Sequence, residues 1–410
     1  MNTSKRYTLF TLTAMLAVNQ LDRNILGITL EAIGQEFTLS DTQLGLLSGA
    51  LFAAVYVLFG FPVAKLSVKG NRRNIIGISV AIWSTLTIAM GAAQNFLQLA
   101  LARLGVGIGE AGGVVPAHSI ISDLYPPERR VSAMATFVVG ANIGILLSFL
   151  IGGIVGQAFG WRWAFFIAGL PGLALSVLIF TTVSEPERDL TAVPLHHGKG
   201  SLFLQTIGVI WRNKALLHVM LGIGISGIVT FGTLAWSATY IIRAHGLSQG
   251  QTGVFFALTI GVIGGLGTWY SGVLADRLGS RNPKWRLGVV VVSILAAKPF
   301  MIGFLLTENT IVALGLLSVA VVYAGVFWAP TFAFLHGQIS DDMRPMATAI
   351  FLFFYNIIGV GIGPTFIGFL SDTIPQTAPG QSLGYALLVV QIAGIWGAYH
   401  YYRAMRTITE

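Results

Sequence analysis

The stretch Gly272-Val-Leu-Ala-Asp-Arg-Leu-Gly-Ser-Arg281 follows a long apolar run, and Pro62-Val-Ala-Lys-Leu-Ser-Val-Lys-Gly-Asn-Arg-Arg73 follows another in the first half of the chain. Each is a short basic segment between two apolar stretches of about 20 residues, the length that crosses a bilayer. Pro116 and Pro330 recur in the same order, each in a later apolar stretch. The sequence therefore predicts two similar halves in the same orientation, which is the arrangement of parallel repeats.

The composition indicates that these apolar stretches lie in lipid. Hydrophobic residues make up 54% of the 410 residues and charged residues only 10%, whereas soluble domains carry roughly 25% charged residues. We therefore expect an all-α membrane protein with twelve transmembrane helices in two pseudo-symmetric bundles. The predicted spans lie near residues 8–30, 44–66, 74–93, 97–121, 131–155, 163–183, 215–241, 251–275, 287–306, 310–335, 346–371 and 382–403.

The longest polar stretch divides these spans into two sets of six. It predicts an N-terminal bundle at 1–183, a cytoplasmic linker at 184–214 and a C-terminal bundle at 215–410. With the N-terminus inside, most of the 24 lysines and arginines fall in inside segments, and only Arg162 and Arg243 face outward. This distribution predicts an integral membrane protein with both termini in the cytoplasm. It also accounts for the net charge of +8 without a nucleic-acid partner.

Charged residues inside the first half are the strongest candidates for function. Asp22 and Arg103 are both expected about 21 Å from the inner face, and Glu110 lies two helical turns beyond Arg103 on the same face. A charge at this depth costs about 2.5–3.5 kcal/mol unless it has a partner or a water-filled cavity. We interpret the three as a site for proton coupling and for the substrate head group. A permanent bridge between two helices is the alternative. Arg23 and His118 are further candidates for the cavity.

The second half is expected to line the substrate cavity with uncharged side chains, because its helices carry hydroxyl and aromatic residues at helical spacing. An aromatic stripe in a membrane helix also serves packing, so that alternative stays open. The candidates are Thr230, Thr233, Ser237, Tyr240, Tyr323, Phe327, Phe334, Tyr355 and Asn356.

Charges at the predicted cytoplasmic ends of the helices suggest a gate that closes the inside by ion pairs. Solvated loop charge is the alternative, since exposed pairs contribute under about 1 kcal/mol. The candidates are Lys69, Arg72, Arg73, Asp123, Asp276, Arg277, Asp341 and Asp342.

Several motifs resemble those of the major facilitator superfamily, namely Ala275-Asp-Arg-Leu-Gly279 and Gly160-Trp-Arg-Trp163. A narrower set is similar to the bacterial spinster-like branch: Leu21-Asp-Arg23, Ala102-Arg103, Gly107-Ile-Gly-Glu-Ala111 and Ser122-Asp-Leu-Tyr-Pro-Pro-Glu-Arg-Arg130. The resemblance implies alternating access and a sphingolipid or lysophospholipid substrate. It also implies a peripheral position for the helix of Lys298, where a snorkelling or bridging side chain is expected. Val68 departs from the pattern, because an acidic residue is usual there.

These features predict a proton-coupled transporter of an amphipathic, lipid-like anion or zwitterion, acting as a monomer. A proton-coupled symporter of a small organic anion is the first alternative, because such symporters share a similar Gly-x-Gly-Glu-Ala segment. A non-transporting membrane receptor is the second. Neither an enzyme nor a cofactor is expected, since the chain has no cysteine, no cluster with metal-ligand spacing and no phosphate-binding glycine loop.

Overall fold

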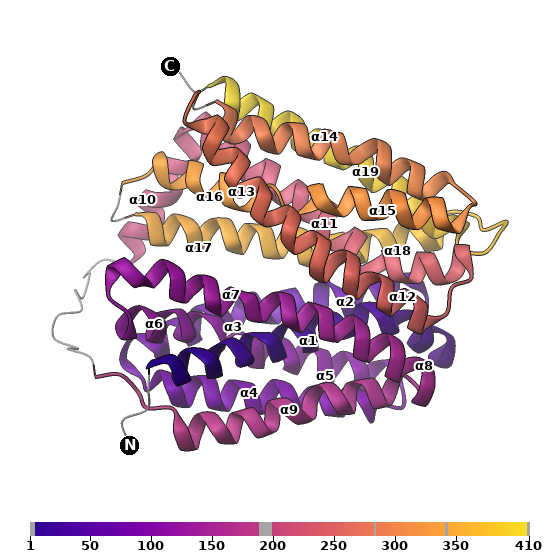
Figure 1. Ribbon diagram of the computed structural model, residues 1–410, viewed down its shortest axis with the longest axis horizontal. Helices are drawn as coiled ribbons and strands as arrows, with labels where there is room; N and C mark the ends of the chain where they lie inside the picture. The colour runs from indigo at the N-terminus through magenta and orange to yellow at the C-terminus, as the bar shows by residue number, and fades with distance from the viewer. Residues whose placement is uncertain (1–4, 188–198, 283, 341–342, 408–410) are drawn as a thin grey trace. The chain divides into compact units, whose positions relative to one another are not determined.

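The computed structural model describes residues 5–187, 199–282, 284–340 and 343–407. Within these ranges the regular structure is helical and no residue lies in a β-strand, which confirms the predicted all-α class. The chain forms two compact units (Figure 1). Unit 1 comprises Met1–Pro194 and Gly246–Gly261, and unit 2 comprises Leu195–His245 and Val262–Glu410.

Unit 1 is built from helices that the apolar stretches predict, with short helices at their ends. Its elements are α1 (Lys5–Phe37), α2 (Asp41–Ser48), α3 (Ala50–Lys69), α4 (Arg72–Gly91), α5 (Phe96–Glu110), α6 (Val114–Leu124), α7 (Pro127–Leu150), the π-helix η1 (Ile151–Val155), α8 (Gly156–Phe159), α9 (Trp161–Thr182) and α12 (Gln249–Phe256).

Helices α1 and α7 of unit 1 lie side by side, as do α4 and α9 (Figure 1). Glycine makes the first of these contacts close. A Cβ atom at Gly140 would lie 2.2 Å from the carbonyl oxygen of Thr13, and one at Gly144 would lie 2.2 Å from that of Ala17. Small residues at such positions let helix backbones approach each other in lipid, where the hydrophobic effect does not hold helices together.

Unit 2 contains the remaining helices. They are α10 (Lys199–Arg212), α11 (Lys214–His245), α13 (Gly265–Gly279), α14 (Trp285–Leu306), α15 (Thr310–Ala324), α16 (Trp328–Gly337), α17 (Arg344–Tyr355), the π-helix η3 (Asn356–Ile362), α18 (Gly363–Thr373) and α19 (Gln381–Arg406). The π-helix η2 (Ala257–Gly264) contains the point where the chain leaves unit 1 for unit 2.

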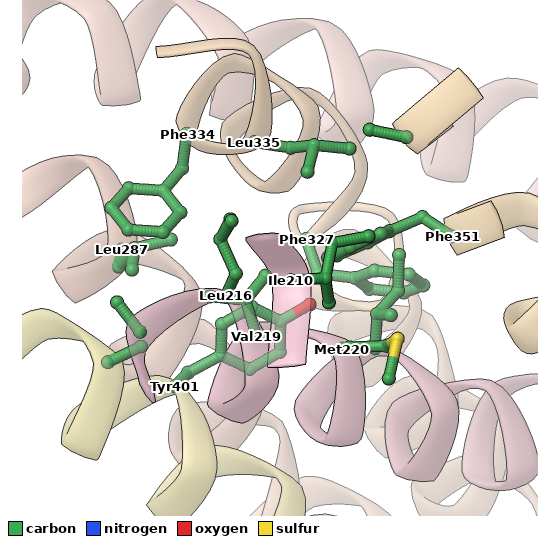
Figure 2. Close-up of a cluster of buried hydrophobic side chains, with 14 of the residues drawn as sticks. Ile210, Leu216, Val219, Met220, Leu287, Phe327, Phe334, Leu335, Phe351 and Tyr401 are labelled. Atoms are coloured by element: carbon green, nitrogen blue, oxygen red, sulfur yellow. The ribbon is translucent and has the colours of Figure 1, made fainter. Parts of the chain in front are cut away.

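The core of unit 2 is a cluster of aliphatic and aromatic side chains (Figure 2). Phe334 of α16, Phe351 of α17 and Tyr401 of α19 belong to it. The Tyr401 hydroxyl lies 2.8 Å from Thr331 Oγ1, so this buried tyrosine has a hydrogen-bond partner. Leu216 of α11 and Leu287 of α14 belong to the same cluster, so these two helices share one packed interior with α19.

Similar helix caps occur in the two halves of the chain. Ser40 and Gln43 form a capping box at the start of α2, and Ser248 and Gln251 form the same box at the start of α12. Asn95 caps α5, and Asn309 caps α15. Each of these side chains satisfies backbone N–H groups that a helix start leaves unpaired. The caps recur in the same order in both halves, as parallel repeats require.

Ten helices in the described part of the chain are long and apolar enough to cross a membrane. The expected first span is not among them, because α1 carries polar and charged side chains, including Asp22 and Arg23. The expected tenth span is also not among them; there the chain forms two shorter helices, α15 and α16, with a turn at 325–327 between them.

Two segments differ from the predicted division of the chain. The predicted linker at 184–214 contains a helix, α10, which packs against α11 and α17. Residues 246–261, which the sequence assigns to the second half, pack with unit 1. There Gly153 and Gly253 lie so close that a Cβ at Gly153 would be 2.7 Å from the Cα of Gly253. Gln249 also donates from Nε2 to the carbonyl oxygen of Gly152 at 2.7 Å.

Candidate functional site

An ion pair between α1 and α5 lies in the interior of unit 1. Arg23 donates to Oε2 of Glu110 from Nη2 at 2.6 Å and from Nε at 3.0 Å. The Glu110 side chain is fully buried, and that of Arg23 is 23% exposed. The Arg23 guanidinium also lies over the rings of Phe52 and Tyr56, at 4.7 and 5.0 Å from their centroids. Charge pairing and cation–π contact therefore hold the same guanidinium.

Arg103 lies in the same interior but binds backbone rather than a carboxylate. Its Nε donates to the carbonyl oxygen of Leu47 at 3.2 Å, and its Nη2 donates to that of Arg23 at 3.4 Å. It too lies over Phe52, 4.7 Å from the ring centroid. Its Nη1 has no hydrogen-bond partner among the described residues. One donor of a buried, permanently charged group is thus unused in this state.

Asp22 is the least satisfied group of the site. Its side chain is buried, and neither carboxyl oxygen has a hydrogen-bond partner in the described part of the chain. Trp83 and Thr87 of α4 face this carboxyl group, although neither makes a hydrogen bond of ordinary geometry with it. A buried polar atom without a partner costs about 1–3 kcal/mol. Such an atom calls for an explanation, such as a functional role or a bound water or ion.

The structure therefore brings Asp22, Arg103 and Glu110 into one interior, but it pairs Glu110 with Arg23 instead of Arg103. Arg23 was the weaker candidate from the sequence, because it points about 100° away from Asp22 around the helix. That same rotation turns it toward α5. The Arg23 guanidinium packs over Phe52 and Tyr56, two aromatic residues four positions apart on α3. Their spacing in the sequence does not identify them as contacts of Arg23.

His118 does not join this site. Its side chain is exposed, and its ring packs edge-on against Phe137 at a centroid distance of 5.2 Å.

The predicted polar stripe of α11 divides into an accessible and a buried part. Thr230 and Thr233 are partly exposed, whereas Ser237 and Tyr240 are 1% and 5% exposed. Ser237 donates to the carbonyl oxygen of Thr233 at 2.7 Å, and the Tyr240 hydroxyl donates to that of Leu305 at 2.9 Å. Ser237 and Tyr240 thus fasten helices, and only the two threonines present accessible hydroxyls.

The aromatic candidates of unit 2 mostly belong to its core. Phe327, Phe334 and Tyr355 are at most 5% exposed and pack within the cluster of Figure 2. Tyr323 is partly exposed and stacks on Phe300. Asn356 donates from Nδ2 to the carbonyl oxygen of Leu352. The packing alternative describes the three core residues better than a cavity wall does, because their rings contact each other and their neighbours rather than an open surface.

The candidate gate centres on a fully buried guanidinium at the start of α4. Arg72 donates from Nη1 to Asp123 at 2.5 Å and to Ser119 Oγ at 2.7 Å, and from Nε to Glu185 at 2.7 Å. The sequence predicted Arg72 and Asp123 but missed Glu185, which follows α9 and looks there like a linker charge. Arg73 belongs to the same group, because its backbone N–H donates to Glu185 at 2.8 Å.

The other gate candidates add little to this network. Arg277 is exposed. Asp341 and Asp342 lie outside the described residues, as do the side chains of Lys69 and Asp276.

A second ion pair that the sequence did not predict joins the C-terminal end of α1 to the start of α9. Glu36 Oε2 accepts from Trp161 Nε1 at 2.7 Å and from Arg162 Nη1 at 2.5 Å. The hydrogen bond from Arg162 lowers the pKa of the Glu36 carboxyl group below its usual value. Partial burial opposes this shift, and the hydrogen bond from Trp161 adds to it.

Comparison with known proteins identifies the family of this chain. The model of the Major Facilitator Superfamily matches residues 12–364. The chain belongs to the major facilitator superfamily. A structure of a bacterial homolog of the human lysosomal transporter Spinster, inward-facing and unoccupied, superposes with a TM-score of 0.89. Its sequence is 26% identical, and the match covers 99% of this chain and 98% of that one. The resemblance to the spinster-like branch is thereby confirmed.

Related sequences carry several substrate names. An MFS-type efflux pump of Mycolicibacterium smegmatis is 32% identical over 92% of this chain and 86% of its own length. A hexuronate transporter of Bacillus subtilis is 25% identical, with 87% and 85% covered. A sphingosine-1-phosphate transporter of Xenopus tropicalis is also 25% identical, with 93% and 77% covered. This superfamily member is therefore an integral membrane transporter, and its relatives are transporters rather than enzymes.

Proposed function

We propose that this transporter is proton-coupled and moves an amphipathic anion or zwitterion of the sphingolipid or lysophospholipid type by alternating access. The observation that carries the proposal is the pairing of Arg23 with Glu110, beside an Asp22 and an Arg103 that have no ionic partner among the described residues. Two acids and two bases share one interior, and only one acid is neutralised by contact.

Such an arrangement responds to a proton. A proton on Glu110 removes the charge that holds Arg23, because a neutral carboxyl group binds a guanidinium far less strongly. Arg23 and the unused Nη1 of Arg103 then both become donors for an anionic head group. Loss of the head group returns Arg23 to Glu110 and expels the proton. Proton binding and substrate binding are therefore linked through one guanidinium.

The proposed substrate class is supported by the names of the relatives. The sphingosine-1-phosphate transporter supports a lipid-like substrate, and the hexuronate transporter supports the alternative of a small organic anion. The efflux pump supports export. We further propose twelve membrane spans and a monomer in a bacterial inner membrane. The proposed cytoplasmic position of both termini is supported by the positive residues in the predicted inside segments.

Flux in proteoliposomes tests both parts of the proposal. Lysophosphatidates of increasing chain length and glucuronate serve as probes, with and without a proton gradient. Wild-type protein should move the lipid against its gradient, with affinity rising with chain length, since each buried methylene contributes about 0.8 kcal/mol. Glu110→Gln should abolish gradient-driven flux, whereas Glu128→Gln, an exposed acid at the start of α7, should not. Full uphill transport by Glu110→Gln would rule out Glu110 as the proton carrier.

Strong competition by glucuronate, with no effect of chain length, would replace the lipid proposal with the organic-anion one. The topology is tested by labelling in intact cells, which is straightforward because the chain has no cysteine of its own. Single cysteines placed after His197 and after Glu410 should react only from the cytoplasmic side. Reaction from outside intact cells would overturn the proposed orientation.

A further inference from the structure

Lys298 is a charged residue in the interior of unit 2. It lies on α14 and is 8% exposed. Its Nζ donates to Oε1 of Gln391 on α19 at 2.9 Å, which is its one hydrogen bond among the described residues. Gly394, one turn along α19, makes room for it, because a Cβ there would lie 2.3 Å from Nζ. The lysine therefore does not snorkel, and it forms no ion pair with a residue that the structure describes. It reaches inward to a neutral amide.

Gln391 also forms a hydrogen bond with a residue of α11. The Gln391 side chain is 2% exposed, and its Nε2 donates to Oγ1 of Thr233 at 3.3 Å. The three residues form a chain from a buried amine to a partly exposed hydroxyl on α11. Glycine at 394 and the length of the lysine side chain allow three helices to contribute one group each.

The donor and acceptor of each hydrogen bond in this series follow from the chemistry of the three side chains. A protonated lysine amine donates hydrogen bonds and accepts none, so the atom of Gln391 that faces it must be the amide oxygen. The amide nitrogen must then face Thr233, where it can only donate. The Thr233 oxygen accepts that bond, and its own proton has no acceptor among the described residues. Thr233 is thus oriented as a donor, and each bond in the chain polarises the next.

We propose that Thr233, polarised by Lys298 through Gln391, is a binding subsite for an anionic oxygen of the transported molecule. The subsite takes the oxygen of a phosphate or a carboxylate, because an O–H donor at the end of a cationic chain favours a negatively charged acceptor. Lys298 and Gln391 act as positioning residues, and Thr233 makes the contact. This inference rests on the proposed transport function and adds a determinant of anion selectivity from unit 2.

The test compares binding of lysophosphatidate and of glucuronate to purified protein in detergent. Thr233→Val keeps the shape and removes the hydroxyl, and we expect it to weaken binding of the transported probe about 10-fold or more, as for loss of a hydrogen bond to a charged group. Thr233→Ser should restore most of the affinity. Thr85→Val is the matched control, because Thr85 is exposed and bonds only its own helix, at Ala81.

The relay is tested by a double-mutant cycle. Lys298→Met should weaken binding of the same probe in the wild-type background and have little effect in the Thr233→Val background, because both changes remove the same donor. Additive effects would show that Lys298 acts elsewhere and would overturn the relay. Should Lys298→Met fail to fold, Gln391→Leu serves in the same cycle.

The two proposals fail in different ways. If wild-type protein binds a probe and Thr233→Val binds it equally well, the subsite is wrong while the transport function stands. If wild-type protein binds and transports neither probe, both proposals are wrong. Loss confined to lysophosphatidate would assign the subsite to phosphate, and loss confined to glucuronate would assign it to carboxylate.

Discussion

The interiors of the two units differ sharply, although matching helix caps occur in the two halves of the chain. Unit 1 contains Asp22, Arg103 and Glu110 buried together, with Arg23 at their edge. Unit 2 contains a packed aromatic cluster and one amine, Lys298, and its acids Glu308 and Asp372 are exposed. The caps of the two halves are alike, so they do not depend on either interior. Among the described residues, the buried cluster of two acids and an arginine occurs in unit 1, whereas unit 2 buries a lone amine.

This contrast suggests a division of labour. A buried ion pair gives little net stability compared with apolar packing of the same volume, so the charges of unit 1 are better explained by binding and proton transfer. Aromatic packing in unit 2 contributes stability directly, through buried apolar area and ring contacts. Changes in the core of unit 2 should therefore alter stability, whereas changes in the interior of unit 1 should alter transport.

The largest expected effect is on the core of unit 2. Phe327→Ala removes a ring that is 3% exposed and contacts Trp328 and Tyr355. We expect a loss of about 3–5 kcal/mol, the usual cost of deleting a buried aromatic ring. Thermal unfolding of the purified protein in detergent measures it. Phe369→Ala, at a phenylalanine that is 52% exposed, is the matched control and should change little. Equal losses for both would mean that the cluster is not a stabilising core.

Much of this architecture could be predicted from the sequence. Lipid leaves helices and closed barrels as the only spanning structures, so long apolar stretches predict the helical class that the structure shows. The parallel halves stay a prediction from the repeated loops and prolines. The helix rise predicts that Asp22, Arg103 and Glu110 lie at membrane depth, and the structure shows all three buried. Pairing did not follow, because it depends on how each helix is rotated about its axis. Arg23 meets Glu110 only once α1 and α5 are packed.

Two other features were beyond the reach of the sequence for similar reasons. The contact of Lys298 with Gln391 requires α14 to approach α19 at Gly394. The sequence contains 50 glycines, and nothing distinguishes Gly394 from the others as a site of helix contact. Glu185 was read as part of a polar linker, because its neighbours are charged. Its role depends on Arg72, more than a hundred residues earlier in the chain.

We expect an intermediate loss of stability when the ion-pair network at the start of α4 is weakened. Glu185→Gln weakens two bonds, from Arg72 Nε and from the backbone N–H of Arg73, and leaves a buried guanidinium with less compensation. We expect a loss of about 1.5–3 kcal/mol, typical of hydrogen bonds to charged groups. Glu187→Gln, two residues on and exposed, is the control. Unfolding midpoints that do not differ between the two variants would show that Glu185 is only a solvated linker charge.

The smallest expected effect concerns an exposed ion pair and its dependence on pH. Glu36 is 42% exposed and Arg162 is 33% exposed, so solvent screening limits their pair to about 1 kcal/mol or less. The pKa of Glu36 is lowered in the folded protein, chiefly by the hydrogen bond from Arg162. Its contribution is therefore complete above the ordinary pKa of glutamate and is lost as the pH falls through the lowered value. Glu36→Gln should accordingly unfold at a slightly lower temperature than wild type at neutral pH, and the difference should vanish in acid. Glu308→Gln, at an exposed acid of unit 2, should show no such convergence, because the two curves should coincide throughout. A difference for Glu36→Gln that stayed constant down to acid pH would mean that the Gln side chain alters packing at Trp161, and that the charge of Glu36 contributes nothing to the folded state.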